Sequence, residues 1–430
     1  MSYRVARAHD ARPTPGMSTI FVQIAAYRDP ELVPTLRDCV RKARHPEQLR
    51  FGICWQKDDT ESLHEFARDE RFRIIPVDYR DSRGVCWARS QIQQLYRGET
   101  YTLQLDSHHR FIPDWDAELV AMMALTGSQK PILTAFGPSY DPFDDSKFVH
   151  VPWRMVFSRF TPEGVAFFMP QAIDNFSELH APLRARFFSA HFTFTTGSFC
   201  HEVPYDPHYY FHGEEINMAV RAFTHGYDLF HPPKVVVWHE YTRQYRTKQW
   251  DDHTAEKQVA TPWTTRNDES HRRNRVLFGM ETGDIDFGKY GFGTARTLRD
   301  YEDYAGISFR LRLAQEYTLR NEPPPNPVVY RTDQEWRDHC IKEFWTRIRL
   351  RRADVPDADD CDFWYVGVHD RHGGELFRND LTPAQIEDIL QQPEPHFIFT
   401  YRSSLRAHSW TVWPHSKSKG WLTKITVPMS

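Results

Sequence analysis

Cysteine is scarce in this chain, and its cysteines are not grouped. Only six occur in 430 residues, at positions 39, 54, 86, 200, 340 and 361, and no Cys-x-x-Cys pair is present. This spacing argues against a dense disulfide framework. Scattered unpaired thiols are typical of proteins in a reducing compartment, so we expect a cytoplasmic location.

Long apolar runs and an excess of charge of one sign are also missing. No run approaches the roughly 18 apolar residues of a membrane-spanning helix. Residues 1–17 are polar and contain no apolar core of a secretory signal, which predicts a flexible leader. Lys and Arg (54) nearly balance Asp and Glu (58), so composition gives no support for binding to nucleic acid or to an anionic membrane.

Three common cofactor and nucleophile motifs are absent as well. The sequence has no Walker-type Gly-Lys-Ser and no Gly-x-Gly-x-x-Gly after its first predicted strand, which argues against a P-loop and a dinucleotide site. It also lacks the Gly-x-Ser-x-Gly elbow of serine hydrolases. The 40% hydrophobic content is nevertheless ample for a buried core.

The first part of the chain alternates apolar β-rich runs with helical patterns. The expected strands cover 19–25, 50–55, 72–77 and 101–105, and the expected helices cover 29–43, 60–68 and 84–96. Asp29 is a plausible N-cap for the first helix, with Pro30 at its first position. This alternation predicts an open α/β sheet, in which ligands bind beyond the carboxyl ends of the strands.

The rest of the chain predicts a second architecture. Further elements are a strand at 130–135, an irregular segment at 140–190 that suits an acceptor wall, a helix at 214–225 and a strand at 234–238. A Pro-rich break at 323–330 predicts a linker between a domain at 18–322 and a module at 331–430. Short apolar runs at 363–368, 396–401 and 410–413 make that module β-rich.

The triplet Asp106-Ser107-His108 stands directly after the fourth predicted strand. Alternate residues there can turn toward one point, and a carboxylate with an imidazole suits Mn²⁺, or Mg²⁺ that carries phosphates. The alternative is that Asp106 caps a turn and His108 is a surface histidine. His239, after the late strand, is the candidate third ligand, while His109 and His231 are competing histidines.

Two further groups of residues could carry chemistry. Glu214 and Glu215 open the helix at 214–225, where acids either stabilise the helix dipole or contact a sugar hydroxyl. Gly84 allows the backbone close to a ligand, and Arg89 can reach a phosphate or a base edge, although a structural role is open for each. Arg243 could add positive charge close to His239, or lie on the surface.

These motifs together resemble the GlcNAc-transferase family that includes the hydroxyproline-polypeptide N-acetylglucosaminyltransferase. The likeness is carried, in family order, by Ile24–Leu32, Gly84–Arg89, Gln104–Phe111, His212–Ile216, His231–Pro233, Trp238–Tyr241 and Tyr290–Thr297. It spans residues 18 to about 310 and leaves the tail after 330 outside. The family is in turn similar to the mucin-type GalNAc transferases, which share an Asp-Ser-His motif and a later histidine.

The resemblance implies a GT-A fold, a UDP-sugar donor, Mn²⁺ and retention of the anomeric configuration. It implies that Asp106, His108 and His239 bind the metal, and that Glu214 and Glu215 lie near the transferred sugar and the acceptor. The residues implied at the donor are Ala26, Tyr27, Arg28, Gly84, Arg89 and Asp106. Which glutamate contacts the sugar stays open, as does the choice between front-face attack and double displacement.

The function expected from these features is transfer of a sugar, GlcNAc by the resemblance, to a hydroxyl acceptor on a polypeptide. Two alternatives from other classes stay open. A metal-dependent hydrolase would use the same Asp106 and His108 without needing a UDP-sugar. A catalytically inactive sugar- or peptide-binding protein would bind the donor without turnover.

Overall fold

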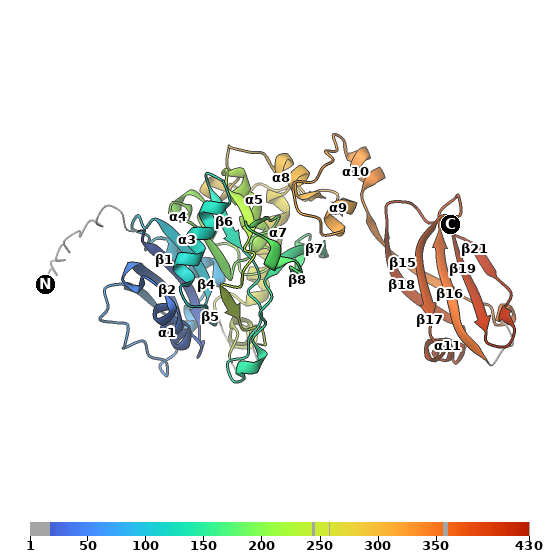
Figure 1. Cartoon of the computed structure of the whole chain (residues 1–430), viewed down its shortest axis with the longest axis horizontal. Helices are drawn as coiled ribbons and strands as arrows, with labels where there is room; N and C mark the ends of the chain where they lie inside the picture. Colours follow the sequence, from blue (N-terminus) through green and yellow to red (C-terminus); the bar gives the residue numbers. More distant parts are fainter. Residues whose placement is uncertain (1–17, 243–245, 258, 356–359, 430) are drawn as a thin grey trace. The chain divides into compact units, whose positions relative to one another are not determined.

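The computed structural model describes residues 18–242, 246–257, 259–355 and 360–429. The chain divides into two compact units. Unit 1 comprises Met1–Ala305 with Asn321–Asn326, and unit 2 comprises Gly306–Arg320 with Pro327–Ser430. Figure 1 shows the large sheet of unit 1 in blue and green and the strands of unit 2 in orange and red. Among the described residues, no helix is long and apolar enough to cross a membrane.

Unit 1 is built on an eight-stranded mixed sheet. Its strands, in spatial order, are β3 (Phe72–Asp78), β2 (Leu49–Lys57), β1 (Ile20–Tyr27), β4 (Tyr101–Asp106), β10 (Phe192–Thr196), β6 (Pro131–Thr134), β11 (Asp228–His231) and β9 (Leu183–Arg184). The first four are parallel, and β10 runs antiparallel to both β4 and β6. The open α/β sheet expected from the sequence is confirmed.

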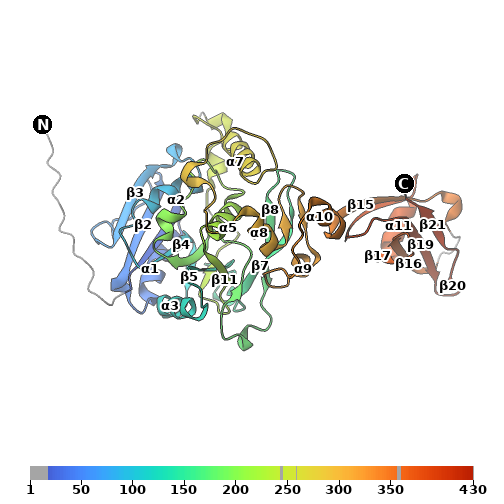
Figure 2. The same cartoon turned by 90° about the horizontal axis from the view of Figure 1, so that it is seen from above.

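Helices cover both faces of this sheet, which explains why its first strands are apolar throughout. On one face Val22 and Ile24 share a core with α1 (Leu32–Lys42) and α3 (Trp115–Leu125), and on the other Phe21 packs with α2 (Val85–Gln93). Figure 2 shows α3 and α2 on opposite sides of β4. The helix α5 (Glu214–Thr224) confirms the helix expected at 214–225.

Smaller elements surround this sheet. They are β5 (His109–Phe111) paired with β12 (Val237–His239), the hairpin β7 (Trp153–Phe160) and β8 (Ala166–Ala172), and the helices α4 (Phe199–Glu202), α6 (Gln249–Asp252), α7 (Trp263–Leu277) and α8 (Leu298–Ala305). The β7–β8 hairpin corrects the expectation that 140–190 is irregular, because Phe157 and Phe168 pair across it and are buried.

Three other expectations are wrong. Residues 60–68 form turns instead of a helix, since Leu63 and Phe66 insert into the core while the Trp55 indole N–H donates to Glu61. The first helix begins at Leu32 with Glu31 as its N-cap residue, and Asp29 lies two residues before Glu31, whose backbone N–H donates to Asp29 Oδ1. The late strand also begins later than expected, so His239 is its last residue instead of following it.

Unit 2 is β-rich, as the sequence predicts. Its elements are β13 (Ile307–Ser308), β14 (Leu313–Ala314), α9 (Glu316–Leu319), α10 (Asp333–His339), β15 (Lys342–Arg349), β16 (Cys361–His369), β17 (Glu375–Leu381), α11 (Pro383–Leu390), β18 (His396–Ser403), β19 (Ser409–Ser416), β20 (Gly420–Trp421) and β21 (Ile425–Pro428). Alternate residues Trp364, Val366 and Val368 of β16 face a core that includes Ile386 and Ile389 of α11.

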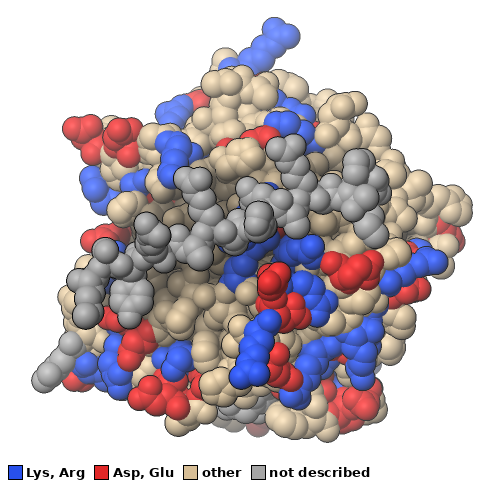
Figure 3. Space-filling view, turned by 90° about the vertical axis from the view of Figure 1, so that its left-hand side faces the viewer, with Lys and Arg blue, Asp and Glu red and all other residues tan. Residues whose placement is uncertain are grey.

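Charged side chains of both signs mix on the surface. Figure 3 shows Lys and Arg interspersed with Asp and Glu over the face in view. This agrees with the near balance of 54 basic and 58 acidic residues. Because charges of both signs mix on this face, we consider individual buried arginines, instead of a basic surface patch, as groups that could contact an anionic ligand.

Leu36 of α1 tests the packing that supports the site. It is 0% exposed, whereas Leu125 of α3 is 56% exposed. We expect Leu36→Ala to lower the free energy of unfolding by about 2–5 kcal/mol through lost burial and a cavity, and Leu125→Ala to change it by less than about 1 kcal/mol. Urea unfolding of the whole chain measures both. Equal effects would show that α1 does not contribute to the core as described.

Candidate functional site

The carboxyl ends of β1, β2 and β4 lie together at one edge of the sheet. The parallel register places Ala25 of β1 beside Asp106 of β4, and Tyr27 of β1 beside Gln56 of β2. Gln56 also donates a 3.1 Å hydrogen bond from Nε2 to the Ala26 carbonyl. Because ligands of open α/β sheets bind beyond these ends, the polar residues that follow the strands form the candidate site.

A short antiparallel ladder brings the last of the expected ligands to this edge. Only Ser107 and His108 separate β4 from β5, and β5 pairs with β12 so that His109 stands opposite His239. His108, His109 and His239 are all buried, and the ring centroids of His108 and His239 are 4.7 Å apart. Residues 130 positions apart in sequence therefore meet at the end of β4.

The structure brings Asp106, His108 and His239 together with spacings that fit one metal ion. Asp106 Oδ2 lies 3.8 Å from His108 Nε2 and 3.6 Å from His239 Nε2, and the three ligand atoms lie within 4.8 Å of one another. Two atoms that each bind an ion at about 2.1 Å lie at most about 4.2 Å apart, and both distances from Asp106 Oδ2 are within this limit. Neither ring nitrogen of His239 makes a hydrogen bond with a described residue, so these nitrogens are available to a metal.

The charge states of these groups also suit a cation. Burial alone would raise the pKa of the Asp106 carboxyl, but His239, Arg89 and His108 outweigh burial and hold that pKa well below its ordinary value. Burial lowers the pKa of His239 well below its ordinary value. At neutral pH the site therefore offers an ionised carboxylate and a neutral imidazole, which are the forms that bind metal.

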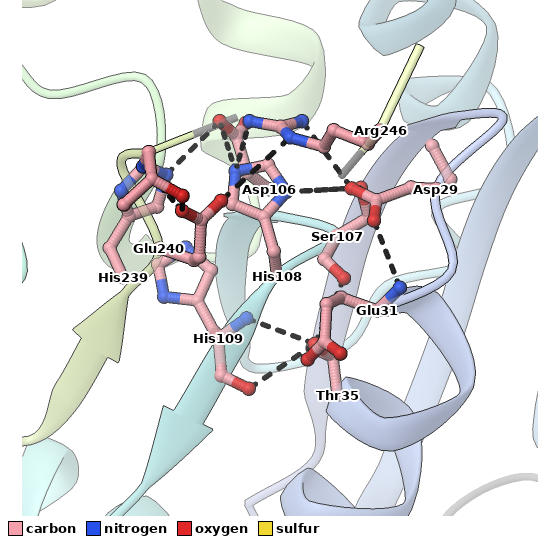
Figure 4. A network of polar contacts seen from close by, with 12 residues as sticks. Asp29, Glu31, Thr35, Asp106, Ser107, His108, His109, His239, Glu240 and Arg246 are labelled. Atoms are coloured by element: carbon pink, nitrogen blue, oxygen red, sulfur yellow. Dashed lines mark hydrogen bonds and ion pairs between the residues drawn. The ribbon is translucent and has the colours of Figure 1, made fainter. Parts of the chain in front are cut away.

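Asp29, expected from the sequence as a helix cap, lies in the candidate site. Its Oδ2 accepts hydrogen bonds of 2.7 Å from His108 Nδ1 and from the Ser107 hydroxyl, and its Oδ1 accepts one from the backbone N–H of Glu31. Although burial opposes ionisation, His108 and Arg246 lower the pKa of Asp29 to about 2. Asp29 thus fixes the orientation of a candidate metal ligand, as carboxylates beside metal-bound histidines commonly do (Figure 4).

The order of the strands indicates that Asp29 should lie close to the residues after β4. Asp29 follows β1, and β1 is the neighbour of β4, so the side chains after these two strands had to approach each other. The Asp-Pro pair obscured this because it is also typical of a helix start.

Arg89 links Asp106 to the first helical turn of α5. Its guanidinium, 2% exposed, lies 2.7 Å from Asp106 Oδ1 and 2.7 Å from Glu214 Oε1. Glu214 Oε2 in turn accepts a hydrogen bond from the Cys86 thiol. Glu214 therefore forms a buried ion pair with Arg89, and Arg89 bridges the carboxylates of Asp106 and Glu214.

Glu215 faces a different direction from its neighbour Glu214. Its Oε1 accepts a 2.9 Å hydrogen bond from the backbone N–H of Ala190. Burial is the main cause that raises the pKa of Glu215 to about 8, and the nearby Glu214 charge adds to it. At neutral pH the Glu215 carboxyl is mostly protonated, so it can donate a hydrogen bond.

An open pocket lies beside Asp106 and His108, two of the three candidate ligands. The residues that line it are Ala25, Tyr27, Gln56, Val85, Asp106, Ser107, His108, Tyr210, Phe211, Arg246, Thr247, Lys248, Gln249 and Trp250. Of the expected donor residues, Tyr27 and Asp106 line the pocket directly.

The other expected donor residues lie next to it. Ala26 is buried, and Arg28 forms ion pairs with Asp58 and Asp252. Gly84 has a φ of +110°, and a Cβ there would come within 2.7 Å of the Tyr210 carbonyl, so the close approach at Gly84 is made by the chain itself.

Arg246 is the second residue that sequence reasoning missed. Its guanidinium lies 3.1 Å from His108 Nε2 and 3.4 Å from Asp29 Oδ2 (Figure 4). The arginine expected near His239 was Arg243, which lies outside the described residues. Nothing in the local pattern distinguishes the two arginines, because the contacts of Arg246 are long-range.

The two competing histidines take separate places. His109 is fully buried, with its ring centroid 4.9 Å from that of His239, and its backbone N–H donates to the Thr35 hydroxyl. His231 lies against Thr134, with Nδ1 2.8 Å from that residue's carbonyl oxygen. Among the described residues, only Asp106, His108 and His239 form a group with metal-binding geometry.

The candidate metal ligands and the pocket thus lie together at the carboxyl edge of an open α/β sheet, where such sheets bind ligands. The family Glycosyltransferase (GlcNAc) matches residues 19–65 and 60–311, which is more than half of the chain. The chain belongs to this family, and it is a glycosyltransferase. The match confirms the resemblance seen in the motifs and the expected α/β fold class. No curated protein sequence matches the chain significantly.

Three solved structures match the chain at low sequence identity and with TM-scores below 0.5. GalNAc-T7 with UDP, GalNAc and Mn²⁺ matches at 14% identity and a TM-score of 0.45, and the match covers 66% of this chain and 56% of that one. Staphylococcus aureus TarS 1-349 matches at 9% identity and a TM-score of 0.35, covering 60% and 74%. The Pyrobaculum calidifontis mannosyltransferase PcManGT with GDP-Man and Mn²⁺ matches at 10% and 0.36, covering 63% and 73%.

The raised pKa of Glu215 predicts a pH-dependent stability. Between its ordinary pKa of about 4.5 and its folded value of about 8, the folded state binds a proton that the unfolded state has released. Stability contributed by this group therefore falls as pH rises through that window. Glu215→Gln removes the effect, so the melting temperature of the variant should rise relative to wild type, on the order of 3 °C, between about pH 5 and pH 8.

Differential scanning fluorimetry without added metal provides the measurement. Glu178→Gln, at an exposed acid, is the control and should follow wild type across the same range. A constant difference between Glu215→Gln and wild type would mean that Glu215 ionises in the folded protein as it does in the unfolded chain.

Proposed function

We propose that the chain transfers GlcNAc, with retention, from a UDP donor to a hydroxyl acceptor with the aid of a divalent ion, Mn²⁺ or Mg²⁺. The observation that carries this proposal is the meeting of Asp106, His108 and His239 next to an open pocket at the carboxyl edge of the sheet. GlcNAc is the sugar in the name of the matching family. We assign catalysis to residues 18–322 and an accessory role to 331–430, joined by a linker at 323–330.

In this proposal the metal is held by Asp106 Oδ2, His108 Nε2 and His239 Nε2. A bound divalent ion supplies positive charge that offsets the charge developing on the departing diphosphate. The protein contributes ligands in the right charge state and a fixed orientation. Asp29 holds the His108 ring from Nδ1, and Arg89 holds Asp106 from its other carboxylate oxygen.

The donor nucleotide would lie along the ends of β1 and β2. Tyr27 and Ala26 are at the end of β1, and Arg28 stacks over Tyr79 while pairing with Asp252. We assign Ala26, Tyr27 and Arg28 to the nucleotide, while Gly84 and Arg89 support this part of the site from within the protein. Aromatic and guanidinium planes at such positions suit a flat pyrimidine ring.

The states of the two glutamates favour front-face transfer over double displacement. A double displacement needs an ionised carboxylate free to attack the sugar. Glu214 is occupied by Arg89 and Cys86, and Glu215 is largely protonated at neutral pH because burial raises its pKa. Glu215 is better suited to donate a hydrogen bond to a sugar or acceptor oxygen, while the leaving phosphate takes the acceptor proton.

For the acceptor we propose a hydroxyl on a polypeptide, which rests on the family resemblance. Phe211 is 40% exposed at the pocket, and its ring centroid is 5.9 Å from that of Trp250. Two aromatic rings beside the donor pocket offer an apolar surface to the residues that flank an acceptor hydroxyl.

A donor screen with metal variants tests the function. Wild type should be stabilised by UDP-GlcNAc only with Mn²⁺ or Mg²⁺, and should slowly hydrolyse it. Asp106→Asn and His239→Ala should reduce this hydrolysis by about 100-fold or more, since each removes a metal ligand. Thermal shift and release of UDP measure the two effects across a panel of UDP-sugars.

His45→Ala, at an exposed histidine in the loop after α1, is the matched control and should behave as wild type. Unchanged UDP release in Asp106→Asn and His239→Ala would refute the assignment. Release of phosphate from simple esters without a UDP-sugar would point to the hydrolase alternative. Stabilisation by the donor with no UDP release, even when candidate acceptor peptides are supplied, would indicate a binding protein.

A further inference from the structure

The tautomer of His108 is fixed by its surroundings. Nδ1 lies 2.7 Å from Asp29 Oδ2, and both groups are buried. An ionised carboxylate only accepts hydrogen bonds, so the His108 proton resides on Nδ1. The other nitrogen, Nε2, then presents a single lone pair toward the pocket.

That lone pair already has a donor. Arg246 Nη2 lies 3.1 Å from His108 Nε2, and Arg246 Nη1 lies 3.4 Å from Asp29 Oδ2. The Arg246 side chain is 15% exposed, and its Nε is 3.9 Å from Glu240 Oε2. A guanidinium has no acceptor, so it can only donate to this nitrogen. A positive charge therefore stands against the same atom that we assign to the metal (Figure 4).

One lone pair cannot serve both partners. We propose that Arg246 and the divalent ion are alternative partners of His108 Nε2, and that Arg246, once released, positions the donor diphosphate. This inference rests on the proposed function, since it uses the same ligand set. It assigns two roles to one arginine. Arg246 neutralises the buried carboxylates when no metal is bound and supplies a phosphate contact when the donor is present.

The segment that carries Arg246 limits where its guanidinium can go. Residues 246–252, here called the strap, form one wall of the pocket from Arg246 to Trp250. The strap ends at Asp252, which accepts hydrogen bonds from Tyr27 and Arg28 at the end of β1, and Gln249 donates to Ser82. Because this end is anchored, Arg246 stays beside the pocket when it leaves His108.

The released guanidinium suits a diphosphate. Arginine presents paired N–H donors that match phosphate oxygens, and the pocket wall keeps them partly shielded from solvent. Nucleotide binding and metal binding would then be coupled through Arg246. A bound diphosphate offers the guanidinium a new partner, and this frees His108 Nε2 for the metal. Metal binding should accordingly be tighter in the presence of UDP than in its absence.

Removing Arg246 should strengthen the binding of Mn²⁺ and weaken the binding of UDP. Without nucleotide, Arg246→Ala frees the Nε2 lone pair, so Mn²⁺ should bind about 5- to 50-fold more tightly than to wild type. At saturating Mn²⁺, the same variant lacks a phosphate contact, so UDP should bind about 10-fold or more weakly. A residue with a merely structural role would weaken both ligands together.

The experiment is a pair of titrations on the whole chain. Binding of Mn²⁺ is followed by the electron paramagnetic resonance signal of the free ion, and binding of UDP at saturating Mn²⁺ by calorimetry. Arg246→Gln is the second variant, since it keeps an N–H donor without the charge and should fall between wild type and Arg246→Ala. Arg41→Ala, at an exposed arginine of α1, is the matched control and should equal wild type in both titrations.

The possible results distinguish a failure of the proposed metal-dependent function from a failure of the proposed role of Arg246. If wild type binds no Mn²⁺ with or without UDP, the proposed metal function is wrong. If wild type binds Mn²⁺ but Arg246→Ala and Arg246→Gln bind it equally or more weakly, Arg246 does not compete for His108 and the inference is overturned. Unchanged UDP affinity in both variants would overturn the phosphate role of Arg246.

Discussion

The pairing of β5 with β12 is the constraint on which the candidate site depends. It places His239 opposite His109, and the two residues between β4 and β5 carry His108 to the same point. β4 is itself held in register by β1, with Ala25 beside Asp106. Since a one-residue slip in a strand turns every side chain to the other face, these two short ladders decide whether the three ligands converge.

Buried charge is the second constraint, and two arginines satisfy it. Asp29, Asp106 and Glu214 are carboxylates that would be costly to place near one another without partners. Arg89 joins Asp106 to Glu214, and Arg246 approaches Asp29. Arg89 is enclosed within unit 1, whereas Arg246 lines the pocket, so one arginine suits a structural role and the other suits a role that changes with the ligand.

Apolar runs buried on both faces of the sheet made β1 to β4 predictable, and their carboxyl ends located the Asp106-Ser107-His108 motif. Contacts between distant segments were not predictable. The turn at 60–68 resembles a helix locally, but its shape follows from Leu63 and Phe66 reaching the core. The antiparallel β10 in the middle of the sheet is set by its neighbours, and the Arg246 contact joins residues 138 apart.

The adjacent acids Glu214 and Glu215 show why a motif alone does not define a mechanism. They share a helical turn, yet Arg89 holds one in an ion pair while burial raises the pKa of the other to about 8. An ionised carboxylate without a cation partner is what a covalent intermediate requires, and neither residue provides it at neutral pH. In the proposed function, positive charge beside the donor would come from a divalent ion held by Asp106, His108 and His239 and from Arg246, which favours stabilisation of the leaving diphosphate over covalent catalysis.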